Sequence, residues 1–485
     1  MSFKKVLVAN RGEIACRVLQ TLREMQIPSV AIHSEVDADT PHTWIADEAV
    51  LLDDIRGYLD GEKILKIAKE RGVDAIHPGY GFLSENGPFV TACAQAGITF
   101  IGPSEEAMRS FGDKGIARGV ALKAEVPCVP GAQSCETPEE ATRLAAELGF
   151  PVLLKAAGGG GGKGMRRVEK KEEIHDAFLA ASREAEAAFK NPHLLIEKFI
   201  YPARHIEIQV LGDGKNAIAV GERECSLQRR YQKVLEEAPA SSIAPKTRQR
   251  LREDAIRLVC AVGYKGAGTV EFLVGPDEQH YFLEINTRLQ VEHPITEELT
   301  GMDLVRQQIL IAAGGSLPET PEQRGYAFEA RLNAEDPYTQ FMPQTGDISV
   351  LQWPQMPRVR IDSGVVEGNE ISPHYDSMIA KVVAFGETRD EARQRLAEAL
   401  RQTIILGLKT NRDFLIDLLE RDFFIEQKTY TTTVEEETWT APKLPEHLRE
   451  LADNLQRPTQ KRSSGQGDPD PYNPWTRLTN FRMMP

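Results

Sequence analysis

A run of five glycines, Gly158–Gly162, followed by Lys163-Gly164-Met165, is the strongest local sign of chemistry in the sequence. Consecutive glycines expose backbone N–H groups and can close over phosphate oxygens. The run is not a Walker A motif, because alanine precedes it and Gly164 stands where Ser or Thr would bind magnesium. A flexible linker is the alternative. The buried-strand pattern of Pro151–Lys155 just before it favours a phosphate-covering loop between strands.

A predicted β-hairpin downstream brings two carboxylates together. If the hairpin pairs Val274 with Tyr281, Glu271 faces Glu284, and the period of two puts Asn286 on the same face. Like charges directly opposed destabilise a sheet unless something neutralises them, which Mg²⁺ would do while binding substrate phosphates. A solvent-exposed acidic face is the alternative. The other face is expected to carry apolar residues: Phe272, Phe282 and Ile285.

The next segment, 287–294, combines a cation, an amide and a base. Arg288, Gln290 and Glu292 alternate, so an extended segment would aim all three the same way, beside the predicted metal. A polar surface loop is the alternative and the commoner fate of such a segment. Further charges upstream are not assigned individually, because charge clusters are usually solvated: 204–209, 228–233, Glu236 and Glu237.

Alternating strands and helices must position these groups. Near the N-terminus the apolar pattern predicts a strand at Val6–Ala9, a helix at Glu13–Met25 and a strand at Pro28–His33, and similar units continue to residue 102. Such alternation predicts a parallel sheet covered by helices. The first turn lacks G-x-G-x-x-G, so a dinucleotide-binding function is poorly supported.

Two further regions and a polar tail follow. The second, from about 112 to 323, contains a helical patch near 169–190 and strand-like runs at 194–200, 205–211, 268–274 and 280–286. The third, from Tyr326, mixes predicted strands with a helix: Val359–Asp362, Met378–Phe385 and Asp390–Leu400. Beyond Pro442 the chain becomes polar, and 463–471 is expected to be a flexible linker.

Composition sets broad limits. The chain has 485 residues, a net charge of −14 and 41% hydrophobic residues, which indicates a globular protein of several domains. Its acidic character argues against binding to nucleic acid or to an anionic membrane. Six cysteines without a C-x-x-C pair favour reduced thiols and a cytoplasmic location. We expect no targeting signal and no membrane span.

Taken together and in order, the motifs resemble the biotin carboxylase family, over roughly residues 4–440. The segments that carry this resemblance are 9–15 (ANRGEIA), 77–86 (HPGYGFLSEN), 112–114 (GDK), 155–165, 204–210 (RHIEIQV), 232–239 (QKVLEEAP), 284–294 (EINTRLQVEHP), 329–337 (EARLNAEDP) and 375–378 (YDSM). One such string would be suggestive, whereas nine in order are highly specific.

The resemblance implies a multidomain α/β and α+β fold and a reaction. It implies an N-terminal doubly wound domain (1–112), an ATP-grasp domain (113–325) with a mobile Gly-rich lid at about 131–203, a C-terminal biotin carboxylase domain (326–441) and a polar tail (442–485). The implied activity is ATP- and Mg²⁺- (or Mn²⁺-) dependent carboxylation of biotin by bicarbonate through carboxyphosphate. A homodimer is implied as well.

The family pattern also assigns roles to residues. Nucleotide phosphates would be held by Lys114, Lys155 and the lid, namely Gly158, Gly159, Gly160, Gly161, Gly162, Lys163, Gly164 and Met165. The adenine and ribose would lie near Glu197, Lys198, Ile200, His205 and Gln228. The metal would be bound by Glu271, Glu284 and Asn286. Bicarbonate would be bound by Lys233, Arg288, Gln290 and Val291, with Glu292 as general base. Biotin would contact Tyr80 and Arg331, and Arg331 would stabilise its enolate.

Two departures qualify these expectations. Tyr231 stands where many relatives have histidine, which puts one ribose contact in doubt. No Met-Lys-Met biotinylation site occurs, so biotin is expected on a separate carrier protein, with a carboxyltransferase subunit as a further partner. The tail could dock one of them. The alternatives are another ATP-grasp carboxylate-amine ligase, or an inactive regulatory subunit. The final carboxyl acceptor stays open among acetyl-CoA, other acyl-CoA, pyruvate and 2-oxoacids.

Overall fold

The computed structural model describes residues 3–157 and 165–443. The Gly158–Gly164 part of the predicted lid and nearly all of the predicted tail therefore lie outside the described residues. The helices and strands described here belong to one compact unit, Met1–Trp439. None of the helices within the described ranges has the length and apolar character that crossing a membrane requires.

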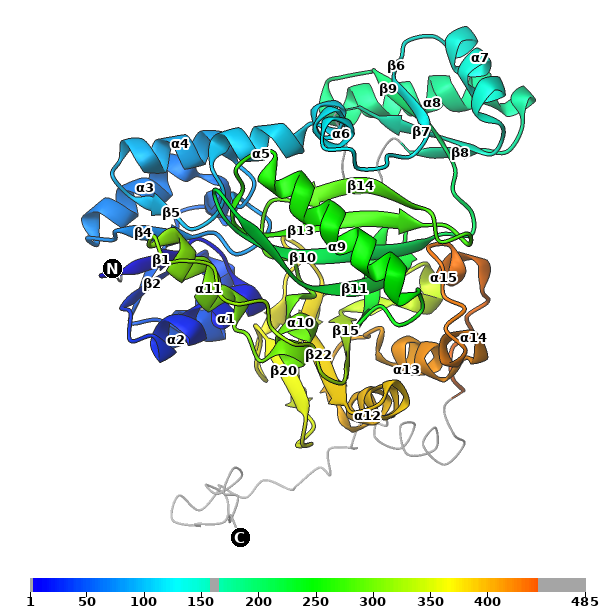
Figure 1. Cartoon of the computed structure of the whole chain (residues 1–485). Coiled ribbons are helices and arrows are strands. Elements are labelled where there is room, and N and C mark those ends of the chain that lie inside the picture. The colour runs from blue at the N-terminus through cyan, green and yellow to red at the C-terminus, as the bar shows by residue number, and fades with distance from the viewer. Residues whose placement is uncertain (1–2, 158–164, 444–485) are drawn as a thin grey trace, which may run out of the picture. The chain divides into compact units, whose positions relative to one another are not determined.

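The N-terminal region folds around a five-stranded parallel sheet in the order β3-β2-β1-β4-β5 (Figure 1). This confirms the parallel sheet that the alternating pattern predicts. Its strands are β1 (Val6–Val8), β2 (Ser29–His33), β3 (Glu48–Leu51), β4 (Ala75–His77) and β5 (Thr99–Phe100). Its helices are α1 (Gly12–Glu24), α2 (Pro41–Ile45), α3 (Gly61–Glu70), α4 (Gly87–Gln95) and α5 (Glu105–Gly112).

Both faces of this sheet are buried, which explains why β1 is continuously apolar. Val6 and Val8 pack into one core with residues of α1 and of α11 (Leu304–Ala312). Leu7 points to the opposite core, among residues of α3 and α4. The period of two along the strand therefore divides its side chains between two helical layers.

A four-stranded antiparallel sheet forms the region after α6 (Lys114–Lys123). Its order is β6 (Gly131–Cys135), β9 (Leu194–Lys198), β7 (Val152–Ala156) and β8 (Arg166–Val168). Residues of α7 (Pro138–Leu148) and α8 (Ile174–Phe189) share its apolar core. The strand predicted at Pro151–Lys155 is confirmed as β7.

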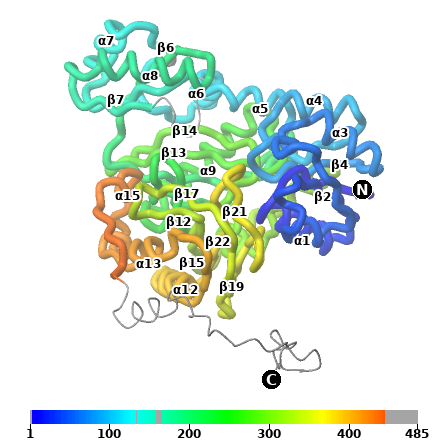
Figure 2. Tube along the Cα trace, turned by 180° about the vertical axis from the view of Figure 1, so that it is seen from behind, coloured from blue at the N-terminus to red at the C-terminus, as the bar shows by residue number. Residues whose placement is uncertain are grey.

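The largest sheet has eight strands and carries the predicted hairpin (Figure 2). Its order is β14 (His280–Asn286), β13 (Lys265–Val274), β10 (Arg204–Asp213), β11 (Ala217–Arg229), β12 (Gln232–Ala238), β15 (Tyr326–Asn333), β22 (Met378–Gly386) and β20 (Val359–Ser363). Strands before and after residue 325 thus join in one sheet through the antiparallel pairing of β12 with β15.

Helices and short ladders complete the unit. The helices are α9 (Pro245–Cys260), α10 (His293–Thr300), α12 (Arg389–Gln402), α13 (Arg412–Glu420), α14 (Asp422–Ile425) and α15 (Thr433–Glu436). The two-stranded ladders are β16 (Glu335–Asp336) with β17 (Met342–Pro343), β18 (Gly346–Asp347) with β21 (Glu370–Ile371), and β19 (Val350–Gln352) with β23 (Ile404–Leu406).

A buried ion pair fastens α12 to β12. Arg389 donates to Glu237 Oε2 from Nε at 3.0 Å and from Nη2 at 2.7 Å. Burial raises the pKa of Glu237 to about 7, because the charge of Arg389 offsets only part of the desolvation and the neighbouring Glu224 adds repulsion. The folded state therefore binds this proton more tightly than the unfolded chain does.

The raised pKa of Glu237 makes stability depend on pH in a definite direction. Protonated Glu237 contributes fully to the free energy of unfolding below the ordinary glutamate pKa. This contribution is lost as pH rises through about 7. Since glutamine cannot ionise, the melting temperature of Glu237→Gln relative to wild type should increase between pH 5 and pH 8. Calorimetry at several pH values measures this difference, and a difference that stays constant or falls would contradict the assignment.

Candidate active site

Lys233 of β12 lies at the centre of a buried cluster of oxygen atoms. Its Nζ is 2.5 Å from Glu207 Oε2, 2.9 Å from Glu271 Oε1, 3.0 Å from Gln290 Oε1 and 2.6 Å from Glu292 Oε1. Burial alone would lower the pKa of Lys233, but the surrounding carboxylates raise it well above its usual value. The cluster therefore holds a permanent ammonium among several anionic groups.

Glu292 is held between two cations. One oxygen accepts from Lys233, and the other accepts from Arg331 Nη2 at 2.9 Å. Burial favours the neutral acid, yet Lys233, Arg331 and the buried Arg223 hold the pKa of Glu292 well below its usual range. Arg331 also donates from Nε to Glu236 Oε1 at 2.6 Å. Glu292 is thus an ionised carboxylate with both oxygens oriented.

Strand register explains why so many carboxylates meet here. Arg223, Glu207, Glu271 and Glu284 pair in turn across β11, β10, β13 and β14, so they form one row across the sheet. Arg223 ion-pairs with Glu207 at one end of the row. Lys233 bridges Glu207 and Glu271.

The predicted pairing of Glu271 with Glu284 is confirmed, but the predicted register at the turn is wrong. Val274 pairs with His280, and not with Tyr281, and the register shifts between Glu271 and Phe272. That β-bulge leaves Leu283 without a partner and reverses the side-chain direction beyond it. Consequently the apolar side chains expected away from the site do point into the core: Phe272, Phe282 and Ile285.

Glu284 is the carboxylate of the row that has no direct partner. None of the hydrogen bonds or ion pairs in the described part of the chain involves its side chain, whereas Glu271 contacts Lys233, Asn286 and Gln290. Burial and the charge of Glu271 raise the pKa of Glu284. A cation between the two carboxylates would relieve this repulsion.

The segment 287–292 forms neither strand nor helix, so the predicted extended geometry is only partly correct. Gln290 and Glu292 do converge on Lys233. Arg288 instead donates from Nη2 to Asn286 Oδ1 at 2.9 Å and from Nε to Glu85 Oε2 at 3.1 Å. Arg288 therefore contacts Asn286 and Glu85, whereas Gln290 and Glu292 contact Lys233 directly.

His205 and Gln228 are neighbours, as expected for residues of one subsite. Gln228 Nε2 lies 2.9 Å from His205 Nδ1 and donates to the Cys225 carbonyl at 2.8 Å. His205 Nε2 is 3.1 Å from Glu271 Oε2, next to the carboxylate row. Tyr231 lies outside this group, is half-exposed and has a positive φ of 66°.

Lys114, Lys155, Glu197 and Glu284 line one pocket, whose other residues include Arg118 and Phe282. Lys155 on β7 forms an ion pair with Glu197 on β9. Burial lowers the pKa of Lys114, and the positive charge of Lys155 contributes to the same shift. Two lysines that repel each other beside an unpartnered carboxylate make a site for an anion and a cation together.

The remaining predicted residues are placed less tightly. Lys198 Nζ donates to the carbonyls of Gly149 and Phe150, and Ile200 follows the end of β9. Val291 accepts a bond at its backbone carbonyl from Lys381. Tyr80 packs against the core of the N-terminal region, and its buried hydroxyl has no hydrogen-bond partner within the described residues. Met165 lies just before β8, whereas Gly158–Gly164 are outside the described residues.

Sequence reasoning missed several residues of this cluster. Glu207 accepts from Lys233 and from the buried Arg223, and Glu236 accepts from Arg331. Glu85 holds both Thr287 and Arg288. The alternation of His205, Glu207 and Gln209 along β10 was a usable signal, since all three share the face that carries the site. For Glu85 and Arg223 no local pattern distinguishes them from surface charges.

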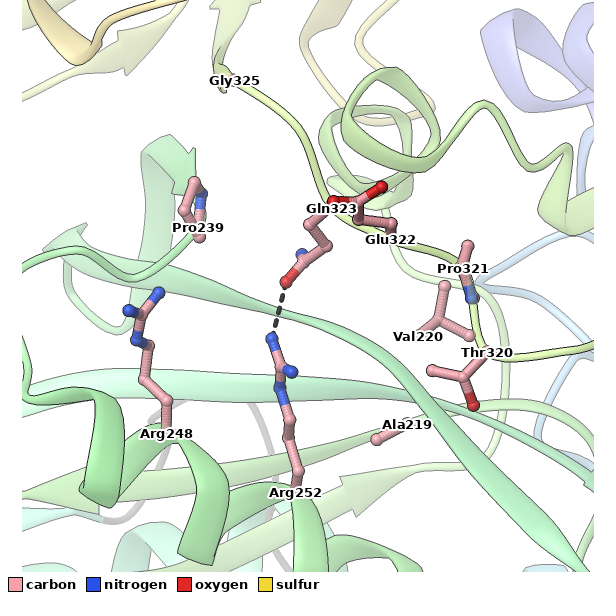
Figure 3. Close-up of a pocket in the computed structure, with 10 residues that line it drawn as sticks. All are labelled: Ala219, Val220, Pro239, Arg248, Arg252, Thr320, Pro321, Glu322, Gln323 and Gly325. Atoms are coloured by element: carbon pink, nitrogen blue, oxygen red, sulfur yellow. Dashed lines mark hydrogen bonds between the residues drawn. The ribbon is translucent and has the colours of Figure 1, made fainter.

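A separate cavity of about 330 Å³ lies beside α9 and contains none of the predicted site residues (Figure 3). Arg252 crosses it to donate to Gln323 Oε1 at 2.6 Å. Arg248 and Arg252 both contact the buried Glu222, which balances part of their charge. The lining of this cavity therefore shares no residue with the cluster around Lys233.

Three family models match the chain in sequence. They are "Biotin carboxylase, N-terminal domain" at residues 2–108, "Carbamoyl-phosphate synthase L chain, ATP binding domain" at 113–320 and "Biotin carboxylase C-terminal domain" at 329–436. The two flanking models distinguish the chain from other ligases that share the central domain.

Curated relatives and solved structures that resemble this chain include biotin carboxylases, in agreement with the family models. Biotin carboxylase 1 of Bacillus subtilis is 46% identical over 89% of this chain and 98% of its own length. The mitochondrial methylcrotonoyl-CoA carboxylase subunit alpha of Rattus norvegicus is 46% identical over 93% of this chain, which spans 63% of that relative. The Campylobacter jejuni biotin carboxylase structure, a βγ-ATP complex, has 43% identity and a TM-score of 0.87, covering 90% of this chain and 99% of that one.

A fourth relative was solved with ligands that bear on the site. The biotin carboxylase domain dimer of Hydrogenobacter thermophilus 2-oxoglutarate carboxylase is described in complex with MgADP, ADP and bicarbonate. It is 43% identical to this chain, has a TM-score of 0.87, and covers 91% of this chain and 100% of its own.

Proposed function

This chain belongs to the biotin carboxylase family, and from that premise we propose that the cluster around Lys233 carboxylates biotin with MgATP and bicarbonate. The observation that carries the proposal is the position of Glu292, an ionised carboxylate between Lys233 and Arg331. A general base flanked by two permanent cations suits a substrate that is itself an anion and must lose a proton.

Bicarbonate would bind against Lys233, Arg288, Gln290 and the backbone of Val291. Glu292 takes its proton, and the nearby cations stabilise the extra negative charge that remains on the substrate. Those cations lower the basicity of Glu292, but they favour deprotonation of bicarbonate as well. The pair can therefore exchange a proton at neutral pH.

The nucleotide side of the site is formed by the pocket that Lys114 and Lys155 line. The two lysines offset phosphate charge, and the predicted lid would exclude water from the reacting groups. Glu197, Lys198 and Ile200 are proposed beside the adenine, with His205 and Gln228 beside the ribose. The contact between His205 and Gln228 supports one shared subsite for the last two.

Glu271 and Glu284 fit a divalent cation, Mg²⁺ or Mn²⁺, with Asn286 as a further oxygen donor. Glu284 supports this assignment because it is half-buried, lies opposite another carboxylate and has no hydrogen-bond or ion-pair partner among the described residues. Mg²⁺ bound there would screen the charge of the nucleotide phosphates. Glu207 is a weaker candidate, because Arg223 and Lys233 already neutralise it.

Glu284→Gln tests this metal assignment. Removing one charge from the carboxylate pair should raise the Mg²⁺ concentration for half-maximal ATP cleavage by about 10-fold or more, a loss of roughly 1.4 kcal/mol or more in binding. The melting temperature should not fall, since the side chain has no hydrogen bond or ion pair in the described part of the chain to lose. Magnesium titrations at saturating ATP measure the shift, and an unchanged Mg²⁺ requirement would refute the role of Glu284.

The proposed reaction proceeds in two steps, the formation of carboxyphosphate and the carboxylation of biotin. An oxygen of deprotonated bicarbonate forms a bond to the γ-phosphorus as the bond to ADP breaks, which gives carboxyphosphate. Carboxyphosphate then fragments into CO₂ and phosphate, the phosphate takes the N1′ proton of biotin, and N1′ attacks CO₂. Arg331 stabilises the enolate oxygen that exists only during this transfer, with Tyr80 proposed beside the biotin ring.

The partners and domain limits belong to the same proposal. Biotin would arrive on a separate carrier protein, a carboxyltransferase subunit would use the product, and the chain would form a homodimer in the cytoplasm. The family matches at 2–108, 113–320 and 329–436 support domains at 1–112, 113–325 and 326–441, with the tail from 442. Relatives named for different acceptors leave acyl-CoA, pyruvate and 2-oxoacid systems open.

Purified protein tests the activity directly through ATP cleavage with and without bicarbonate and free biotin. We expect cleavage that needs Mg²⁺ and bicarbonate, and carboxybiotin only when biotin is added. Cleavage that ignores both substrates would indicate another ATP-grasp ligase. No cleavage under any condition would indicate an inactive regulatory subunit.

A further inference from the structure

Lys381 of β22 is a fully buried cation to which the proposed mechanism gives no role. Its Nζ donates to the backbone carbonyl of Val291 at 3.1 Å. It is also 3.0 Å from Glu13 Oε2 on α1 and 3.7 Å from Asp362 Oδ2 on β20. Burying an ammonium group without partners costs free energy, so each of these contacts stabilises Lys381 in the folded protein.

The carbonyl that Lys381 holds belongs to the centre of the catalytic segment. Val291 joins Gln290 and Glu292, which both contact Lys233. Between β14 and α10 this segment has no strand pairing to fix its backbone. Its position therefore depends on individual bonds such as the one from Lys381.

Arg331 and Lys381 are direct cross-strand partners in the pairing of β15 with β22. Paired residues point to the same face of a sheet. Arg331 reaches the carboxylate of Glu292, while Lys381 reaches the carbonyl of the residue before it. Two adjacent cations thus hold the same dipeptide, one through its side chain and one through its backbone.

We propose that Lys381 is a positioning residue that sets the geometry of Gln290–Glu292 for bicarbonate. This inference rests on the proposed function. The bond to Val291 fixes the peptide from which the base projects, and the contact with Glu13 joins the N-terminal region to the site. Lys381 acts through the segment and touches no substrate.

The surrounding charges are consistent with a permanently protonated Lys381. Burial would lower the pKa of Lys381, but Glu13 and Asp362 raise it above its ordinary value. Asp362 is itself held by Arg360, with two contacts of 2.8 Å, and its pKa is lowered to about 2. Arg360 also contacts Glu297 and Glu298, and its positive charge lowers the pKa of Lys381 less than the nearby carboxylates raise it.

Lys381→Met removes the donor and keeps an unbranched side chain. We expect kcat/KM for bicarbonate to fall by roughly 10- to 100-fold, because misplacing a reacting group by about 1 Å can cost about 100-fold. KM for MgATP should stay within about twofold of wild type, since Lys381 does not approach the nucleotide pocket. Lys381→Gln should show the same selective loss, and it keeps a polar group in the cluster should the methionine variant not fold.

Glu13→Gln is the matched control, because it alters the same buried cluster without removing the donor to Val291. Its kcat/KM for bicarbonate should remain within about threefold of wild type, a difference of roughly 0.6 kcal/mol in activation free energy. A folded Lys381 variant with unchanged bicarbonate kinetics would overturn the inference, as would equal losses for both substrates in all three variants. Wild-type protein without bicarbonate-dependent ATP cleavage would instead refute the proposed function itself.

Discussion

Glu292→Gln should reduce bicarbonate-dependent ATP cleavage by about 10²- to 10⁴-fold, the usual contribution of a general base. Glutamine keeps the size of the side chain, but its one carbonyl oxygen can accept from only one of the two cations that Glu292 contacts, Lys233 and Arg331. It cannot take a proton from bicarbonate, so the nucleophile does not form. Steady-state ADP release at saturating MgATP measures this loss.

Glu329→Gln provides the control for that experiment. Glu329 lies on the neighbouring strand β15, is fully buried, and burial raises its pKa well above the usual value. Burial thus favours its neutral carboxyl, which glutamine resembles, so this variant should leave the rate of ADP release close to that of wild type. A Glu292→Gln variant with near-wild-type cleavage would show that another group removes the proton.

Arg331→Ala should abolish carboxybiotin formation while MgATP still binds. Loss of the guanidinium that faces the enolate should cost about 10²- to 10³-fold in carboxylation, the range found for removal of one oxyanion donor. The pocket that Lys114 and Lys155 line is formed without Arg331, so nucleotide affinity should persist. Calorimetric titration with a non-hydrolysable ATP analogue and a carboxybiotin assay measure the two effects separately.

The matched control is Arg389→Ala, which removes another buried arginine bound to a glutamate of β12. It should lower the melting temperature without changing the ratio of carboxybiotin formed to ATP cleaved. If Arg331→Ala loses ATP binding together with carboxylation, its effect is structural and the assigned role in enolate stabilisation is wrong.

The sequence predicts the catalytic face well because local patterns encode it. The predicted hairpin places Glu271 opposite Glu284, and the structure confirms that pair because the bulge at Leu283 offsets the one-residue error in the predicted register at the turn. The bulge at Leu283 could not be predicted, because an extra residue in one strand leaves no compositional mark. The contact of Arg288 with Glu85 is a tertiary effect, since Glu85 is 203 residues away in the chain.

The fold also contains one part that local sequence patterns predict and another that depends on residues far apart in the chain. The parallel N-terminal sheet follows from alternating apolar segments, and it forms as predicted. The eight-stranded sheet does not follow from any segment, because β12 and β15 pair across a long stretch of intervening chain. The local sequence likewise does not distinguish Lys381 from an ordinary polar residue. Only the assembled sheet brings it into contact with the Val291 carbonyl.

In the proposed reaction bicarbonate, and not water, attacks the γ-phosphate of ATP. Bicarbonate labelled with oxygen-18, supplied to the purified protein with MgATP and biotin, tests this directly by mass spectrometry of the released phosphate. The phosphate should carry one labelled oxygen, because the oxygen that attacks phosphorus stays with it when carboxyphosphate fragments. Phosphate that contains only solvent oxygen would show that ATP is hydrolysed by water, and would contradict the proposed reaction.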